Sequence, residues 1–102
     1  MELYPNEQIL ADVGANMFRG IEAVGGRMKI TDKRIIFEPH AVNLQKMVAE
    51  IPLSQVTDVT PRNTLMIVPN GILVRLKSGV EYKFVVRGRE RLIDIIRQHM
   101  NT

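Results

Sequence analysis

The sequence contains few of the side chains that carry covalent catalysis. It has no cysteine, so thiolate nucleophiles, disulfides and cysteine-ligated metal sites are excluded. Its two serines, Ser54 and Ser78, are predicted to lie in turns. Neither lies in the Gly-x-Ser-x-Gly setting that exposes an activated nucleophile. We therefore expect that the chain is not an enzyme.

Histidines and glycines do not form a ligand set either. His40 and His99 are far apart in the sequence and have no companion carboxylates at metal-ligand spacing. His99 is expected to be a packed, half-exposed residue of a helix. Gly20, Gly25 and Gly26 match neither a dinucleotide fingerprint nor a phosphate loop, so we expect them in turns. These patterns predict no metal and no cofactor.

Basic residues remain as candidates for binding chemistry, and they are unevenly distributed. Residues 52–102 carry eight Lys/Arg against four Asp/Glu, whereas residues 1–51 carry six against seven. A net charge of +3 permits an anionic partner without requiring one. An ordinary solvated surface is the alternative. We do not expect nucleic acid as a partner, because the five tyrosines and phenylalanines are expected in the core and leave no stacking platform.

Length and composition indicate one folding unit. A chain of 102 residues, 45% hydrophobic and 25% charged, suits a single globular domain over residues 1–102. No apolar run approaches the ~18 residues of a transmembrane helix, and the start lacks the pattern of a secretory signal. Together with the absence of cysteine, these features predict a cytoplasmic protein, with peripheral membrane association left open.

Short runs rich in β-branched and aromatic residues recur about every ten residues, which is typical of a small sandwich or barrel. Turn residues separate them, and we expect Pro61 and the pair Asn70-Gly71 to end strands. The expected strands cover residues 8–13, with an extension to 18 left open, and 27–31, 34–38, 47–53, 55–60, 64–68, 72–77 and 80–86.

The last two runs are predicted to form a hairpin across Ser78-Gly79. Alternation places Leu76, Tyr82 and Phe84 inward. It places Arg75, Lys77 and Lys83 outward, as a second basic face of the molecule. Such charged residues also protect sheet edges from pairing with other chains, and we favour that role for them.

Near residue 89 the period changes from two to that of a helix. Leu92, Ile95, Ile96 and His99 share one face of a helix over residues 89–100. A helix this short is marginal alone, so we expect its apolar face to cover the open end of a curled sheet.

Three arginines, Arg87, Arg89 and Arg91, cluster at the start of this helix. The helix dipole disfavours cations there. Such a cluster marks either an interaction surface or a place where the protein tolerates a loss of helix stability.

Residues 26–37, GRMKITDKRIIF, resemble the signature of GRAM domains: a glycine, alternating hydrophobic positions, Thr-x-x-Arg and a final Phe. Residues 50–56 are similar to the strand and turn that follow in that family, and residues 70–84 to its late hairpin. The resemblance extends from about residue 7 to residue 100. It implies a pleckstrin-homology-like (PH-like) fold, mostly β with one C-terminal helix, as a small barrel or curled two-sheet sandwich.

The same resemblance implies a binding module at a membrane surface or on another protein. Larger members carry a phosphatase, transferase or lipid-transfer domain beside the GRAM domain, and we expect no such neighbour for this chain. Our first hypothesis is therefore an adaptor that mediates protein interaction or self-association. The alternative is peripheral binding of anionic, phosphoinositide-like lipid headgroups.

Phosphoinositide-binding PH domains use a basic residue at the end of the first strand and a basic-x-basic pair on the second. Arg19, Arg27 and Lys29 resemble that arrangement and are the candidate anion site. Several charge-assisted donors converging on one pocket would suit a phosphate. The nearby Glu22 and Asp32 would weaken the field of this site.

Met17 and Phe18 lie beside the same turn. They are expected in the core, and the alternative is an apolar tip for a membrane or a partner.

Overall fold

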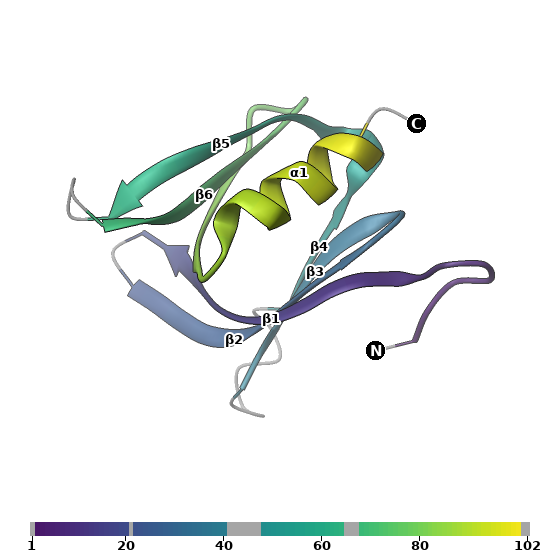
Figure 1. Ribbon diagram of the computed structural model, residues 1–102, viewed down its shortest axis with the longest axis horizontal. Helices are drawn as coiled ribbons and strands as arrows, with labels where there is room; N and C mark the ends of the chain where they lie inside the picture. Colours follow the sequence, from purple (N-terminus) through teal and green to yellow (C-terminus); the bar gives the residue numbers. More distant parts are fainter. Residues whose placement is uncertain (1, 21, 41–47, 65–67, 101–102) are drawn as a thin grey trace.

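The computed structural model describes residues 2–20, 22–40, 48–64 and 68–100, without the side chains of residues 19, 63, 64, 68 and 69. Seven strands, one short 3-10 turn (η2) and one α-helix make up the described chain (Figure 1). They are β1 Ile9–Arg19, β2 Glu22–Thr31, β3 Arg34–Pro39, β4 Ala49–Pro52, η2 Leu53–Gln55, β5 Val56–Thr64, β6 Val68–Leu76, β7 Glu81–Val86 and α1 Arg89–His99.

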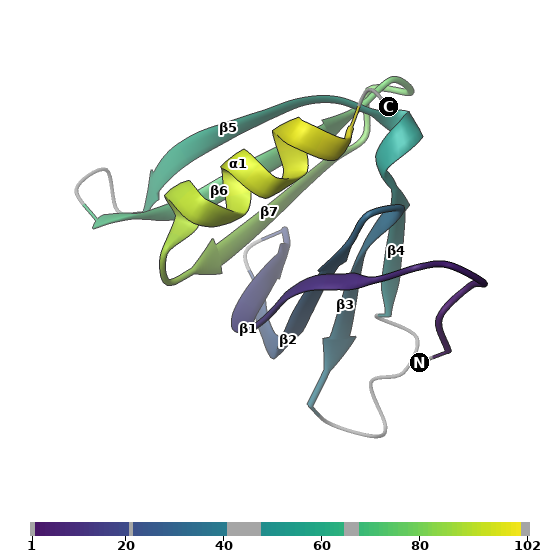
Figure 2. The ribbon, with the colours of Figure 1, turned by 45° about the vertical axis from the view of Figure 1, so that its right-hand side comes forward.

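All strands belong to one antiparallel sheet in the order β4-β3-β2-β1-β7-β6-β5. The sheet does not close, because β4 and β5 are its two edges. It curls instead into two layers, and α1 lies on the β5–β6 layer (Figure 2). The predicted PH-like class is thus confirmed in its curled-sandwich form.

The long strand β1 joins the two layers. It pairs with β2 along most of its length, from Ile9 opposite Thr31 to Arg19 opposite Glu22. Its pairing with β7 is much shorter and covers only Ala15 to Phe18. Over residues 9–14, β1 therefore has a strand on one side only among the described residues.

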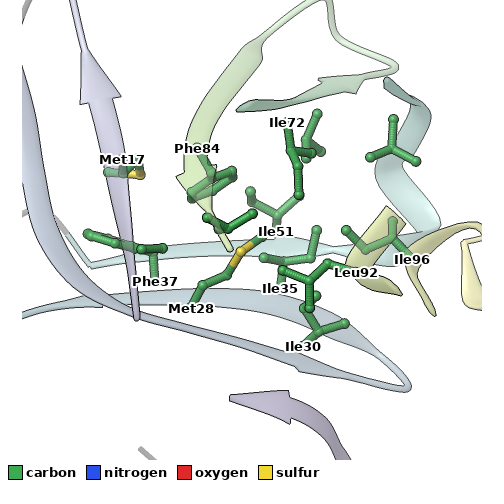
Figure 3. Packing of buried hydrophobic residues seen from close by; sticks show 14 of the residues in the cluster. Met17, Met28, Ile30, Ile35, Phe37, Ile51, Ile72, Phe84, Leu92 and Ile96 are labelled. Carbon is green, nitrogen blue, oxygen red and sulfur yellow. The ribbon is translucent and has the colours of Figure 1, made fainter. Parts of the chain in front are cut away.

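The core fills the space between the layers and α1. Phe37 from β3 and Phe84 from β7 pack with ring centroids 6.1 Å apart, and both are fully buried (Figure 3). Leu92, Ile93 and Ile96 close the core from α1. Each contributes about 1.5–3 kcal/mol on full burial. The predicted helix is confirmed, with Ile95 and His99 half-buried at the margin of its apolar face.

Two predicted strand ends are wrong. β5 continues through Pro61 to Thr64, and β6 begins at Val68 and runs through Asn70-Gly71, so the two described ends of the strand predicted over residues 64–68 belong to different strands. Residues 65–67 of that strand lie outside the described residues. Pro61 is tolerated because β5 is an edge strand, where one side of the backbone needs no partner. Gly71 lies within β6, and glycine is required there because a Cβ would lie 2.7 Å from the carbonyl oxygen of Arg62.

The pair Gly25-Gly26 is also a strand element, and its predicted turn is wrong. A Cβ on Gly26 would clash with the carbonyl oxygen of Glu38 and lie 2.7 Å from the Phe37 ring. Glycine is therefore required there by the close approach of β2 and β3. The third glycine, Gly20, does turn the chain, with a φ of 63°.

The other boundaries agree more closely with expectation. The hairpin of β6 and β7 turns at residues 77–80, with Phe84 buried and Leu76 and Tyr82 packed at the margin of the core. β4 is shorter than the strand predicted over residues 47–53, since it begins at Ala49 and Leu53 belongs to η2. Met47 lies outside the described residues.

Candidate functional site

A groove of about 1070 Å³ crosses the outer face of the sheet at β1. We call it the β1 groove. It is lined by residues 12–16 of β1, 25–27 of β2 and 85–88 after β7, with His40 and Asn70 at its margins.

Gly88 turns the chain at one end of the β1 groove. Its φ of 65° lies in the left-handed region, which glycine adopts without steric cost. The chain turns there from β7 into α1, so the β1–β7 pairing ends at Ala15 opposite Val86. β1 continues beyond this point without a described strand at its side.

The floor of the β1 groove consists largely of main chain. A Cβ on Gly14 would meet only the Nη1 atom of Arg27, at 3.9 Å, within 4 Å. A Cβ on Gly25 would lie 3.3 Å from the side-chain oxygen of Asn16 and 3.7 Å from the His40 ring. Gly14 therefore leaves open space over β1, whereas Asn16 and His40 already occupy the space over Gly25.

Two residues of the predicted anion site lie together on β2, and each pairs with a carboxylate. Arg27 donates from Nε to Asp12 Oδ1 and from Nη2 to the Asp12 carbonyl oxygen, both at 3.0 Å. Lys29 Nζ lies 2.7 Å from Glu38 Oε1. These cations are thus partly neutralised within the chain.

Arg19, the third predicted residue, is placed apart from them. Arg27 of β2 lies opposite Gly14 of β1. Arg19 is itself a β1 residue, five positions further along that strand than Gly14 (19 − 14). At about 3.3 Å per residue this separates the two positions by roughly 16 Å. The side chain of Arg19 lies outside the described part of the structure.

The second basic face is also partly neutralised. Arg75 Nε donates to Glu81 Oε2 at 2.8 Å. Lys83 Nζ lies 5.9 Å from the centre of the Phe18 ring. Lys77 is exposed and has no ion pair with a described residue. This face therefore lacks a dense positive charge.

Met17 and Phe18 point to opposite faces of β1, as alternation requires. Met17 belongs to the core, as expected. Phe18 is half-buried beside Lys83 and is not a core residue.

The arginine cluster at the start of α1 divides between two roles. Arg89 Nη1 donates to the carbonyl oxygen of Arg62 at 2.6 Å. From the last turn of α1, Arg97 Nη2 donates to the carbonyl oxygen of Val59 at 2.9 Å. Both acceptors lie on β5, so these arginines fix the helix to that edge strand. Arg87 and Arg91 are exposed, and Arg87 lines the β1 groove.

A buried ionic network around Arg34 was missed by the sequence analysis. Arg34 binds Glu7 through two hydrogen bonds, Nε to Oε2 at 2.9 Å and Nη2 to Oε1 at 3.0 Å. Thr31 Oγ1 donates to Glu7 Oε2 at 2.7 Å, and Arg34 Nη1 donates to Glu50 Oε1 at 3.0 Å. The Tyr4 ring lies 4.0 Å from the guanidinium carbon.

The hydrogen bonds from Arg34 lower the pKa of Glu7 to about 2, although burial acts in the opposite direction. The hydrogen bond with Glu7 likewise raises the pKa of Arg34. No described buried side-chain nitrogen or oxygen lacks a hydrogen-bond partner. The network is therefore a closed structural unit. In the sequence, the feature that pointed to this network was Arg34 itself. It lies three residues after Thr31 in the GRAM-like motif, at the start of a hydrophobic strand.

Two further properties concern the described residues only. They contain no group of three or more His, Cys, Asp or Glu side chains arranged to hold a metal ion. Among them, α1 is too short and too polar to cross a membrane, and no other helix could do so.

The family pattern described as GRAM domain matches residues 1–101. The chain belongs to the GRAM domain family. GRAM and other PH-like domains generally bind lipids or proteins, and they are typically non-catalytic. No curated protein matches this GRAM domain.

Solved structures share its fold at low sequence identity. The C-terminal domain of an unknown protein from Leishmania infantum is 14% identical, with a TM-score of 0.81 over 96% of this chain and 88% of that one. The Vps36 N-terminal PH domain is 14% identical, with a TM-score of 0.73 over 99% and 87%. The Slm1 PH domain in complex with phosphoserine is 14% identical, with a TM-score of 0.61 over 88% and 90%.

Proposed function

We propose that this GRAM domain is a protein-interaction module that adds an extended segment of a partner protein to β1. The observation that supports the proposal is the one-sided pairing of β1 over residues 9–14, beside the β1 groove. Strand addition at an exposed sheet edge is a general mode of peptide recognition, in which main-chain hydrogen bonds supply affinity.

The physical basis is the set of backbone groups that β7 leaves unpaired. Alternate residues of an antiparallel strand direct their N–H and C=O groups to the same side. Each hydrogen bond formed with a partner strand contributes about 0.5–1.5 kcal/mol. Gly14, whose Cβ position has only Arg27 Nη1 within 4 Å, leaves the face of the sheet beside this edge open.

The distribution of ion pairs favours this function over lipid binding. Arg27, Lys29 and Arg75 each have a carboxylate within 3.0 Å. A lipid phosphate would have to compete with these carboxylates for the same donors. A phosphate-bearing ligand is the competing proposal, because the Slm1 PH domain, which shares this fold, was solved in complex with phosphoserine.

Peptide display against the purified chain tests the proposal, followed by NMR titration of the ¹⁵N-labelled protein. Selected peptides should shift the amide resonances of residues 9–14 most strongly. Gly14→Val, which fills the floor of the β1 groove, should abolish these shifts, whereas Lys77→Gln should not. A dilution series without peptide tests whether a second copy of the chain occupies the same edge.

Two outcomes contradict the proposal. Selected peptides could leave residues 9–14 unchanged and bind elsewhere. Alternatively, the chain could pellet with anionic vesicles at low ionic strength, where surface attraction is strongest, while no peptide binds. The second result would favour a lipid headgroup as the ligand.

A further inference from the structure

The described edges of the sheet differ in how they are protected against pairing with other chains. Short strands, prolines and charged side chains discourage such pairing. The edge strand β4 is four residues long, ends at Pro52 and carries the exposed Glu50. The other edge strand, β5, contains Pro61, and its carbonyl oxygens at Val59 and Arg62 accept hydrogen bonds from arginines of α1. Both edges are therefore protected.

The open stretch of β1, residues 9–14, carries apolar side chains instead. Ile9 is 44% exposed, and Leu10 and Val13 are half-buried. The stretch contains no proline and no lysine. Its one charged side chain, Asp12, is already paired with an arginine of β2. A strand that brings apolar side chains and no net charge is therefore the partner that fits this edge.

We infer that this partner is a second copy of the chain, whose own residues 9–14 supply the added strand. The inference rests on the proposed function, because it names the protein that is added to β1. Residues 9–14 meet the requirement that they impose, since they are apolar and their one charge is balanced within each copy. They are also held extended by β2. Association of two copies thus avoids the entropic cost of ordering a flexible peptide.

Steric and electrostatic constraints select the register of the two β1 strands. Antiparallel pairing about a two-fold axis places one residue opposite its own copy. With Asp12 at that position two carboxylates would face each other, which is unfavourable. With Val13 there, Ala11 of one copy would meet Ala15 of the other, which already pairs with β7. Ala11 avoids both conflicts, and residues 9–13 of the two copies then pair.

The ion pair between Arg27 and Asp12 is compatible with this dimer. Arg27 Nη2 donates to the Asp12 carbonyl oxygen at 3.0 Å. A carbonyl oxygen has two acceptor positions, so the second one stays available for a main-chain N–H of the other copy. The pair therefore balances the charge of the edge without closing it.

A concentration series without any added ligand tests the inference. Sedimentation should change from monomer to dimer between about 10 µM and about 1 mM, because so short a strand pairing gives a small and weak interface. In NMR spectra over the same range, the amide resonances of residues 9–14 should shift most. In a mixture of labelled and unlabelled chains, intermolecular NOEs should connect Ile9 of one copy with Val13 of the other.

Two variants with matched exposure sharpen the test. Ile9→Lys places a charge on the open edge and should weaken the dimer by about tenfold or more. The matched control is Val80→Lys in the β6–β7 turn, where the side chain is 49% exposed, and it should leave the dimer unchanged. Circular dichroism of both variants checks that the fold is kept.

Three results would contradict the inference. A chain that stays monomeric to about 1 mM while its residues 9–14 bind selected peptides would exclude the second copy and leave the proposed function intact. A dimer whose shifts and NOEs lie elsewhere, such as on β5, would also overturn the inference. Absence of both self-association and peptide binding at residues 9–14 would overturn the proposed function as well.

Discussion

Arg34 and Arg27 lie on adjacent strands, belong to the same family signature and each pair with a carboxylate, yet their surroundings differ completely. The Arg34 side chain is 6% exposed and that of its partner Glu7 is fully buried. The Arg27 side chain is 46% exposed and that of Asp12 is 42% exposed. Burial therefore decides which arginine holds the fold together and which is available to a partner.

The covering segments explain this difference. The chain before β1 lies over Arg34, where the Glu2 carbonyl oxygen accepts from Nη2 at 2.7 Å and the Tyr4 ring faces the guanidinium. Beside Arg27, by contrast, Gly14 and Gly25 have no side chain to cover it. Each guanidinium nitrogen of Arg34 forms a hydrogen bond within the chain, whereas Nη1 of Arg27 forms none with a described residue.

Replacement of Arg34 should have the largest effect. Arg34→Met leaves the Glu7 carboxylate buried without its main partner, which costs about 3–5 kcal/mol of unfolding free energy. Arg27→Met removes an exposed pair and should cost less than about 1 kcal/mol. Urea denaturation of both variants measures the two values. Equal losses would show that burial does not separate the two arginines.

Acid should remove the contribution of the Arg34 network to stability, because it protonates Glu7. The pKa of Glu7 is about 2 in the folded chain and about 4.5 when unfolded. Its contribution is therefore complete above pH 4.5 and is lost as the pH falls from about 4.5 to 2. The loss should be smaller than in Arg34→Met, since Arg34 keeps its bond to Glu50.

Thermal unfolding across that pH window provides the measurement for Glu7. Glu7→Gln should show a flatter dependence of the melting temperature between pH 4.5 and pH 2 than the wild type. An unchanged slope would mean that other carboxylates dominate acid unfolding.

Two glycines extend the comparison to the backbone. Gly26→Ala forces a Cβ against the Glu38 carbonyl oxygen, and such overpacking costs about 1–3 kcal/mol. Gly14→Ala meets nothing closer than 3.9 Å and should change stability by less than about 0.5 kcal/mol. Calorimetry of the two alanine variants tests this contrast. A large loss in Gly14→Ala would show that the floor of the β1 groove is a packing position.

Much of the fold was predictable because local patterns carry it. The alternation in residues 72–86 specified the β6–β7 hairpin, and the helical period from Leu92 to Ile96 specified α1. The roles of Pro61 and Gly26 were predicted wrongly because they depend on neighbours distant in sequence. Pro61 is allowed by an edge position, and Gly26 is required by β3.

The candidate site was less predictable for the same reason. The resemblance selected Arg27 and Lys29, but their pairing with Asp12 and Glu38 follows from strand register. The β1 groove depends on where the β1–β7 pairing ends, at Ala15 opposite Val86, which no local pattern indicates. Similarly, Glu7 and Arg34 are 27 positions apart and meet only in the folded chain.

A crystal structure of the chain with a bound strand-forming peptide is the most direct test of the binding role. The peptide main chain should pair with β1 at residues 9–14, on the side that β7 leaves open. A peptide on the β5 edge, or at the β6–β7 turn with β1 unoccupied, would contradict that role.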